Sequence, residues 1–140
     1  MGTWNVLEAI AVADCALEIH GADLDDLFAT AARALADTMV DPATVLPDVH
    51  RTVSLEAREL GLLLYDWLSE LIFLKDSERL IFSDATVTVQ PAPPTLTARL
   101  TGGHIDPHTV RRADAKAVTL HQFTLERRAA GWYARIVIDI

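Results

Sequence analysis

The sequence predicts an α+β fold, in which two helices pack on a mixed, mostly antiparallel sheet of about six to seven strands. Three observations support this fold class. Two segments show helical periodicity, several others have strand character, and the strands after the second helix follow one another without another helix. The order of elements therefore differs from a repeating βαβ pattern. With 140 residues, 51% of them hydrophobic, the chain is long enough to bury one core, and we expect a single domain over residues 1–140.

The first predicted helix begins after Gly21, with Asp23 as its N-cap. Asp25 and Asp26 follow in the first turn, where negative charge complements the helix dipole. Apolar residues then recur at spacings of three and four: Leu24, Leu27, Phe28, Ala31, Leu35 and Met39. This pattern predicts a helix with one buried face, and Asp41-Pro42 should end it.

The second predicted helix runs from about Ala57 to Lys75 and is apolar over most of its circumference. A helix of this kind is typical of a central core element. Its narrow polar strip contains Asp66 and Glu70, which we expect to be a solvent-facing strip or acids held by backbone donors. An acid–base pair is the enzymatic alternative, but no nucleophile elbow or Gly-rich phosphate loop accompanies it. The apolar positions are Leu60, Leu62, Leu63, Leu64, Tyr65, Trp67, Leu68, Leu71, Ile72, Phe73 and Leu74.

The remaining segments favour strands, because they alternate with period two or are rich in β-branched and aromatic residues. We predict a proline-containing turn at 91–94 and a hairpin connection at 129–131. Gly102 to Asp114 has the composition of an exposed loop of functional length. The predicted strands are Trp4–Leu7, Cys15–His20, Val49–Leu55, Leu80–Gln90, Thr95–Thr101, Ala117–Arg127 and Trp132–Asp139.

Composition excludes some classes of partner. The net charge of −8, from 12 basic and 20 acidic residues, disfavours tight binding to nucleic acid and suits a basic surface on a partner protein. Cys15 is the single cysteine, which rules out an internal disulfide and fits a reducing, cytoplasmic setting. The longest apolar stretch, Leu60 to Leu74, is interrupted by polar residues and too short to span a bilayer, and we identify no signal sequence.

The last predicted strand supplies residues for a candidate metal site. Strand alternation places Ile136 and Ile138 on the core face and Asp139 on the outer face, and it places Asp14 outward in the second strand. If these strands are neighbours, Asp14, Asp139 and the carboxylate of Ile140 converge and offer oxygens to calcium or magnesium. Without a cation, repulsion would raise a carboxylate pKa. The alternatives are solvated strand ends that prevent edge pairing, or an acid–base pair.

Four segments together resemble the archease family in order and spacing: Ala13-Asp14, Trp67-Leu68-Ser69-Glu70-Leu71, Lys116-Ala117-Val118-Thr119-Leu120-His121 and Val137-Ile138-Asp139-Ile140. The similarity extends from about Trp4 to Ile140. Archeases are small cofactor proteins of the RtcB-type RNA ligase, which joins tRNA halves or broken RNA with GTP, and they are not ligases themselves. The resemblance implies a cytoplasmic protein that helps the ligase form its guanylated histidine intermediate and turn over repeatedly, in a metal-dependent way.

Carried over to this sequence, the family's metal-binding acids fall on Asp14 and Asp139, and the carboxylate of Ile140 completes the set. The implied metal is calcium, with magnesium or manganese as alternatives. The family's functional lysine falls on Lys116, which would pair with an acid on the ligase or touch a phosphate. The sequence departs from the family where His-Thr is replaced by Ala11-Val12, and where Gly-Glu is replaced by Gly102-Gly103. An alternative function is an acidic protein-binding or chaperone-like module that does not activate a ligase.

The remaining histidines offer a weaker site. His104, Asp106 and His108 lie close together in the predicted loop and could bind zinc. Zinc requires three or four converging ligands, and Gly103 and Pro107 oppose the helix that would bring the two rings to one face, so we favour a polar loop. We expect His121 to make a hydrogen bond that shapes its strand.

Overall fold

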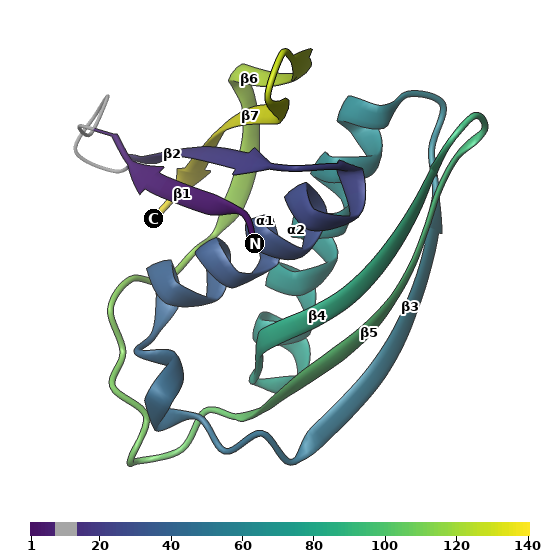
Figure 1. Ribbon diagram of the computed structural model, residues 1–140. Coiled ribbons are helices and arrows are strands. Elements are labelled where there is room, and N and C mark those ends of the chain that lie inside the picture. Colours follow the sequence, from purple (N-terminus) through teal and green to yellow (C-terminus); the bar gives the residue numbers. More distant parts are fainter. Residues whose placement is uncertain (8–13) are drawn as a thin grey trace.

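A computed structural model describes residues 1–7 and 14–140, and two helices lie between two antiparallel sheets in it (Figure 1). The helices are α1 (Leu24–Met39) and α2 (Leu60–Glu78), and a 3-10 turn, η1 (Pro42–Thr44), follows α1. One sheet has the strand order β1-β2-β7-β6, with β1 (Thr3–Val6), β2 (Asp14–Gly21), β6 (Ala117–Arg128) and β7 (Gly131–Asp139). The other has the order β3-β5-β4, with β3 (Val49–Glu56), β4 (Leu80–Pro91) and β5 (Pro94–His104).

The structure confirms the α+β class, the two helices and the seven predicted strands. In the described part of the chain the strands divide between two sheets, and every strand pair is antiparallel, where the sequence predicted a single mixed sheet. The division has a physical reason, because both helices contact strands of both sheets. The predicted single buried face of α1 is therefore wrong, because α1 packs against strands of both sheets, as α2 does.

The helix α1 begins as its sequence predicts. The Asp23 carboxylate accepts a hydrogen bond from the Asp26 backbone N–H at 2.8 Å, which is the geometry of an N-cap. The Asp26 carboxylate in turn accepts from the backbone N–H groups of Gly2 at 2.9 Å and Ala22 at 2.8 Å. These bonds lower the pKa of Asp26, although its partial burial alone would raise it. The start of α1 is therefore tied to the first strand.

The helix α2 is the central core element. Trp67 is fully buried, and its indole N–H donates to the Phe28 carbonyl of α1 at 2.9 Å, which fixes the two helices to each other. The polar strip is also present, with Asp66 exposed and Glu70 half-buried. Phe73 departs from the expected pattern, because this apolar residue of α2 is 59% exposed.

In the described part of the chain, no helix has the length and apolar character needed to cross a membrane.

The predicted loop from Gly102 to Asp114 is wrong at its start, because β5 continues to His104. Gly102 and Gly103 are buried there, and backbone from neighbouring segments approaches closely. A Cβ atom would lie 1.9 Å from the Ile81 carbonyl oxygen at Gly102, and 2.0 Å from the Leu46 carbonyl oxygen at Gly103. Both positions therefore require glycine for a packing reason that strand periodicity does not reveal.

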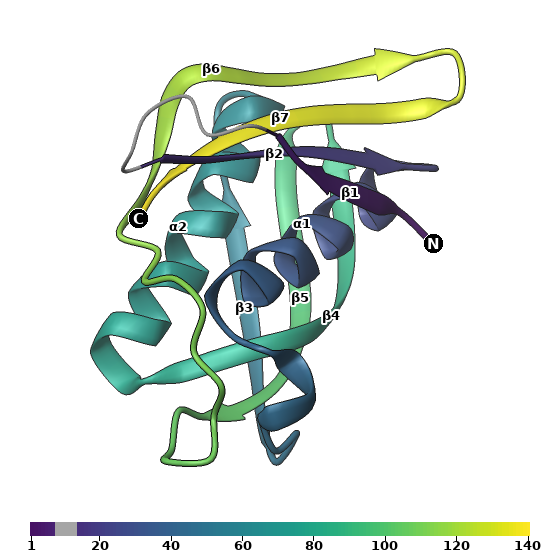
Figure 2. The same cartoon turned by 90° about the vertical axis from the view of Figure 1, so that its left-hand side faces the viewer.

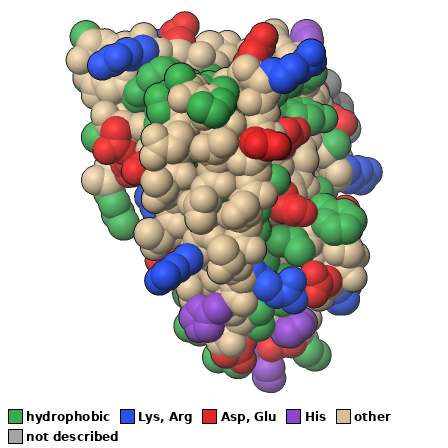
Figure 3. Space-filling model, turned by 90° about the vertical axis from the view of Figure 1, so that its right-hand side faces the viewer, with side chains coloured by type: hydrophobic (Ala, Val, Ile, Leu, Met, Phe, Trp, Pro, Cys, Tyr) green, Lys and Arg blue, Asp and Glu red, His purple; other side chains and the backbone are tan. Residues whose placement is uncertain are grey.

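The three-stranded sheet turns its outer face to solvent. Figure 3 shows this face, where uncharged polar side chains and backbone occupy most of the middle. The exposed strand residues there include Thr52, Ser54, Thr86, Thr88 and Thr97. Threonine suits an exposed strand, because its branched side chain packs on the pleated surface while its hydroxyl remains hydrated. Asp14 and Asp139 lie elsewhere, at the ends of the two central strands of the four-stranded sheet.

Candidate functional site

Three strand ends meet at one corner of the four-stranded sheet. The strand β2 begins at Asp14, and β7 ends beside it, with Asp139 directly opposite Asp14 in the register. On its other side Asp139 pairs with Ala117, the first residue of β6. Figure 2 shows the C-terminus at this corner, next to the start of β2 and the chain entering β6. The structure therefore brings Asp14 and Asp139 together as the strand alternation predicted.

The two carboxyl groups affect each other directly. The pKa of Asp14 is raised above its ordinary value of 3.8 by partial burial, by a hydrogen bond to Asp139 and by repulsion from the Asp139 charge. The positive charge of His121 acts in the opposite direction. No lysine or arginine among the described residues forms an ion pair with either acid. We call this arrangement of Asp14 and Asp139 the acidic corner.

The chain end lies next to the acidic corner. Ile140 follows Asp139, and its half-buried side chain packs against the hydrophobic core, which fixes the position of its backbone. The described residues contain no group of three His, Cys, Asp or Glu side chains arranged to hold a metal ion. A cation here would therefore bind the two aspartates, further backbone or chain-end oxygens, and water.

Lys116 lies at the same corner through its backbone. Its N–H donates to the Asp139 carbonyl oxygen at 2.7 Å, and this bond precedes the pairing of β6 with β7. Its side chain is exposed, and its charge contributes to the lowered pKa of Asp114, although the hydrogen bond from Lys75 is the main cause. Lys116 therefore immediately precedes Ala117, the residue that pairs with Asp139 in the sheet.

Comparison with known proteins gives one consistent family. The model of the Archease protein family matches residues 4–140. The chain belongs to the archease family. Protein archease of Archaeoglobus fulgidus is 34% identical over 129 residues, covering 91% of this chain and 93% of the relative. Protein archease of Thermococcus kodakarensis is 33% identical, and the alignment covers 100% of both chains.

Solved structures agree on the archease fold. The solution structure of Protein 1598 of Methanobacterium thermoautotrophicum superposes with a TM-score of 0.80 at 28% identity, covering 98% of each chain. A crystal structure from Thermotoga maritima, described as an archease and possible chaperone, has a TM-score of 0.67 at 18% identity and covers 93% of each chain. The second likeness concerns the fold alone.

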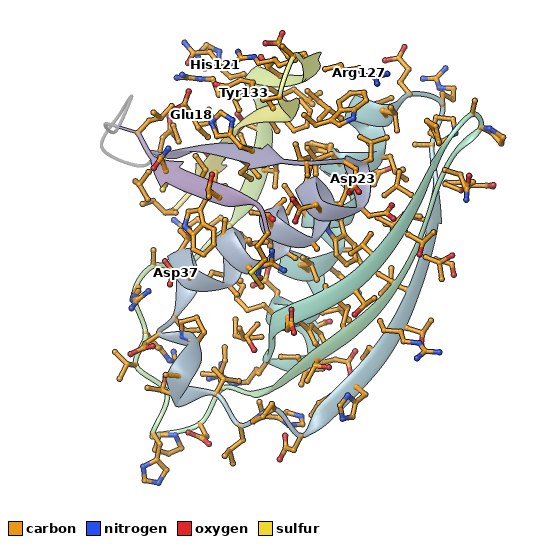
Figure 4. All side chains as sticks on the ribbon, in the orientation of Figure 1. Glu18, Asp23, Asp37, His121, Arg127 and Tyr133 are labelled. Atoms are coloured by element: carbon orange, nitrogen blue, oxygen red, sulfur yellow. The ribbon has the colours of Figure 1, made fainter. Side chains whose placement is uncertain are left out.

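Beyond the acidic corner, the outer face of the same sheet carries a chain of paired polar groups. The Tyr133 hydroxyl donates to the Glu18 carboxylate at 2.7 Å, and the Arg128 guanidinium lies 3.6 Å from the centre of the Tyr133 ring. The Arg135 guanidinium donates to the Gln122 side-chain oxygen at 2.8 Å. Figure 4 shows Glu18, His121 and Tyr133 on the side of this sheet that faces away from the helices. In the described part of this archease, the Arg135 guanidinium on this face bonds to a neutral amide and its Nε has no hydrogen-bond partner, whereas the acidic corner places two carboxyl groups opposite each other.

The loop histidines do not form a comparable centre. The Asp106 carboxylate accepts hydrogen bonds from the backbone N–H groups of His108 at 2.7 Å and Thr109 at 3.1 Å, and this shapes a turn. His104 ends β5 and is exposed. The segment thus has the structure of a polar loop. Ala11 and Val12, where the sequence departs from the family, and Ala13 lie outside the described residues.

Two residues near the site were not recognised from the sequence. His121 was assigned to shaping its strand, and its backbone N–H does bond to the Thr119 hydroxyl at 3.2 Å. Its exposed ring also acts electrostatically on Asp14, a long-range relation that strand spacing does not reveal. Lys75 is the second residue, because it is buried and contacts the segment before Lys116. The sequence does hint at this role, because Lys75 follows Leu68 by seven residues and Leu71 by four, which places a charged residue on the buried face of the helix.

Proposed function

We propose that this protein activates an RtcB-type, GTP-dependent RNA ligase in tRNA splicing or RNA repair, as a partner protein and not as an enzyme. It would promote formation of the ligase's guanylated histidine and allow repeated turnover. Family membership supports this role, and one observation carries the assignment to a site. Asp14 and Asp139 lie directly opposite each other at the acidic corner, without a basic partner among the described residues.

The chemistry of the acidic corner fits a hard divalent cation. Burial is the main cause of the raised pKa of Asp14, and the hydrogen bond to Asp139 and repulsion between the two neighbouring carboxylates add to it. Calcium, magnesium and manganese prefer such oxygen ligands, and a cation would remove the repulsion. Asp14 and Asp139 would hold it, with the carboxylate of Ile140 as the third group that the family resemblance implies. When bound, the cation would supply positive charge that orients phosphate or carboxylate oxygens.

The chain's own residues would then have distinct roles. The strand pairing of β2 with β7 holds the two aspartates in register, and the packed side chain of Ile140 steadies the end of β7. Lys116 presents an exposed ammonium group beside this corner. A compact charge of this kind suits an acid on the ligase or a nucleotide phosphate. The corner would thus combine a metal-holding and a partner-contacting element.

The test uses the ligase encoded in the same genome, with RNA ends and GTP, and counts ligation turnovers with and without this protein. Asp139→Asn, and separately one residue added after Ile140, should each reduce stimulation by at least about tenfold. Asp66→Asn is the matched control, because it removes the same charge from an exposed site on α2 and should preserve stimulation. Circular dichroism would confirm that all variants are folded. Full stimulation by Asp139→Asn would contradict the proposed site.

The second candidate is an acidic protein-binding or chaperone-like module, which the net charge of −8 favours. The same assay separates the two functions. A ligase that labels itself with GTP and turns over equally with and without this protein would support the module. In that case the protein should still bind a basic partner, with an affinity that falls steeply as salt is added.

A further inference from the structure

One charged side chain lies inside the apolar part of the molecule. Lys75 occupies the last turns of α2, in helical phase with the buried residues Leu68 and Leu71, and only 7% of it is exposed. A lysine is rarely this buried unless its ammonium group is paired. Its hydrocarbon stem can cover apolar neighbours, but its charge requires partners.

The ammonium group of Lys75 has three partners, which matches its three protons. It donates to the Asp114 carboxylate, to the Ala115 carbonyl oxygen at 2.6 Å and to the Asp76 carboxylate at 2.8 Å. Burial alone would lower the pKa of Lys75, but hydrogen bonds to Asp114 and Asp76 outweigh it, and the pKa is raised. Lys75 therefore remains charged and bound at neutral pH. Two of the three contacts lie on consecutive residues, 114 and 115, far from α2 in sequence.

The next residue along this segment is Lys116. Its N–H bonds to the Asp139 carbonyl oxygen, so the three residues from 114 to 116 are fixed from two directions. Lys75 holds the first two against α2, and Asp139 holds the third against β7. Ala115, between them, is completely buried. This short segment is therefore a direct structural link between α2 and the acidic corner, and we call it the clamped segment.

Other contacts of the connection between β5 and β6 lie further from Lys116. Arg112 bonds through its backbone N–H to the Met39 carbonyl at 2.8 Å, and through its guanidinium to the Asp37 carboxylate at 2.9 Å. Figure 4 shows Asp37 near the end of α1. A pocket of about 390 Å³, lined among others by Lys75, Arg112 and Asp114, opens beside the clamped segment. Among the hydrogen bonds of the described residues, those from Lys75 tie residues 114 and 115 to α2, while the buried side chain of Ala115 packs in the core.

We propose that Lys75 is a positioning residue, which sets where the Lys116 ammonium group stands relative to the acidic corner. The inference rests on the proposed function, because Lys116 is expected to act on the ligase. Lys75 itself touches neither the ligase nor the cation. Loss of its contacts to Asp114 and Ala115 would remove the two hydrogen bonds that tie the residues before Lys116 to α2. Lys116 would then be positioned by its backbone bond to Asp139 and by the packing of Ala115.

The test compares Lys75→Met with the matched control Arg112→Gln. Methionine keeps most of the buried stem and removes the ammonium group, whereas Arg112→Gln removes a different tether of the same connection. Lys75→Met should lower the maximal stimulation of the ligase about tenfold, because small errors in the position of a functional group are costly. The protein concentration for half-maximal stimulation should change by less than about twofold, because a positioning defect leaves most of the docking surface intact. Arg112→Gln should leave both values within about twofold.

A double-mutant cycle separates positioning from a general loss of stability. In a Lys116→Ala background, adding Lys75→Met should change stimulation by less than about twofold, because the group that Lys75 positions is already absent. A purely structural role would reduce stimulation by the same factor in both backgrounds, which would overturn the inference. Full stimulation by Lys75→Met alone would also overturn it.

Amide hydrogen exchange provides a readout that does not depend on the ligase. Exchange of the Lys116 amide should accelerate at least about tenfold in Lys75→Met relative to Arg112→Gln, while amides in the centres of α1 and β5 keep their protection. If the unmodified protein fails to stimulate the ligase, the proposed function fails, and this exchange still decides whether Lys75 fixes Lys116. An unchanged Lys116 exchange rate would reject the positioning role.

Discussion

The acidic corner and the clamped segment lie close together but differ in whether their charged groups have partners of opposite charge. At the clamped segment, the buried ammonium of Lys75 is matched by two carboxylates and a carbonyl. At the acidic corner, Asp14 and Asp139 stand opposite each other without a basic partner among the described residues. The first arrangement stabilises the fold, and the second is unfavourable by itself. The divalent cation proposed above would offset the repulsion at the acidic corner.

The largest predicted effect on stability concerns the clamped segment. Lys75→Ala should lower the free energy of unfolding by about 2–4 kcal/mol, because it removes buried methylenes and leaves the Ala115 carbonyl without its partner. Urea denaturation in chelator would measure this change. Arg112→Ala is the control, with an expected loss below about 1 kcal/mol, because its ion pair with Asp37 is at the surface, where water screens the attraction. Equal losses in the two variants would show that Lys75 has no special role.

The comparison also shows what the sequence could predict. Period-two alternation placed Asp14 and Asp139 on the outer face, and the register then set them directly opposite each other, so the acidic corner was predictable in outline. Local sequence patterns also predicted both helices, the Asp23 cap and the positions of all strands to within a few residues. The family resemblance, and not spacing, gave these residues their expected role.

The sequence could not reveal relations between distant segments. The partition of the strands into two sheets depends on how both helices pack, and the glycines at 102 and 103 depend on backbone that approaches from elsewhere. Lys75 contacts residues about forty positions away, as its hydrogen bond to Ala115 shows. Phe73 was misplaced because apolar character was equated with burial, and exposed apolar side chains are common.

The second prediction tests the compensation of the acidic corner by a cation. Calcium at one hundred times its dissociation constant would raise the free energy of unfolding by about 2.7 kcal/mol. Thermal melting with calcium against chelator would measure the rise, which Asp139→Asn should remove and Asp114→Asn should preserve. The two variants remove the same charge from neighbouring parts of the molecule, so net charge does not explain a difference between them. A calcium effect of equal size in both would contradict a site at the acidic corner.

The smallest predicted effects are two pH dependences of opposite sign. The folded-state pKa of Asp14 is raised, so in chelator the charged form of Asp14 opposes folding above that pKa. Asp14→Asn should therefore be more stable than the unmodified protein at pH 7. This advantage should disappear as the pH falls through the raised pKa towards 3.8, because protonation of Asp14 removes the desolvation cost of its charge and its repulsion from Asp139.

Asp114 should behave in the opposite way, because the hydrogen bond from Lys75 lowers its pKa. Ionised Asp114 therefore stabilises the folded state above pH 3.8, the ordinary pKa of an aspartate. This stabilisation is lost as the pH falls through the lowered pKa of Asp114. Asp114→Asn should thus be less stable at pH 7, by under about 1 kcal/mol since this carboxylate is largely exposed, and the deficit should vanish in acid. Urea denaturation at several pH values between 7 and about 3 measures both differences. For each variant, the difference in unfolding free energy from the unmodified protein is plotted against pH. If both differences change in the same direction with pH, both acids respond to the overall charge of the protein, and the two sites do not differ in their electrostatics.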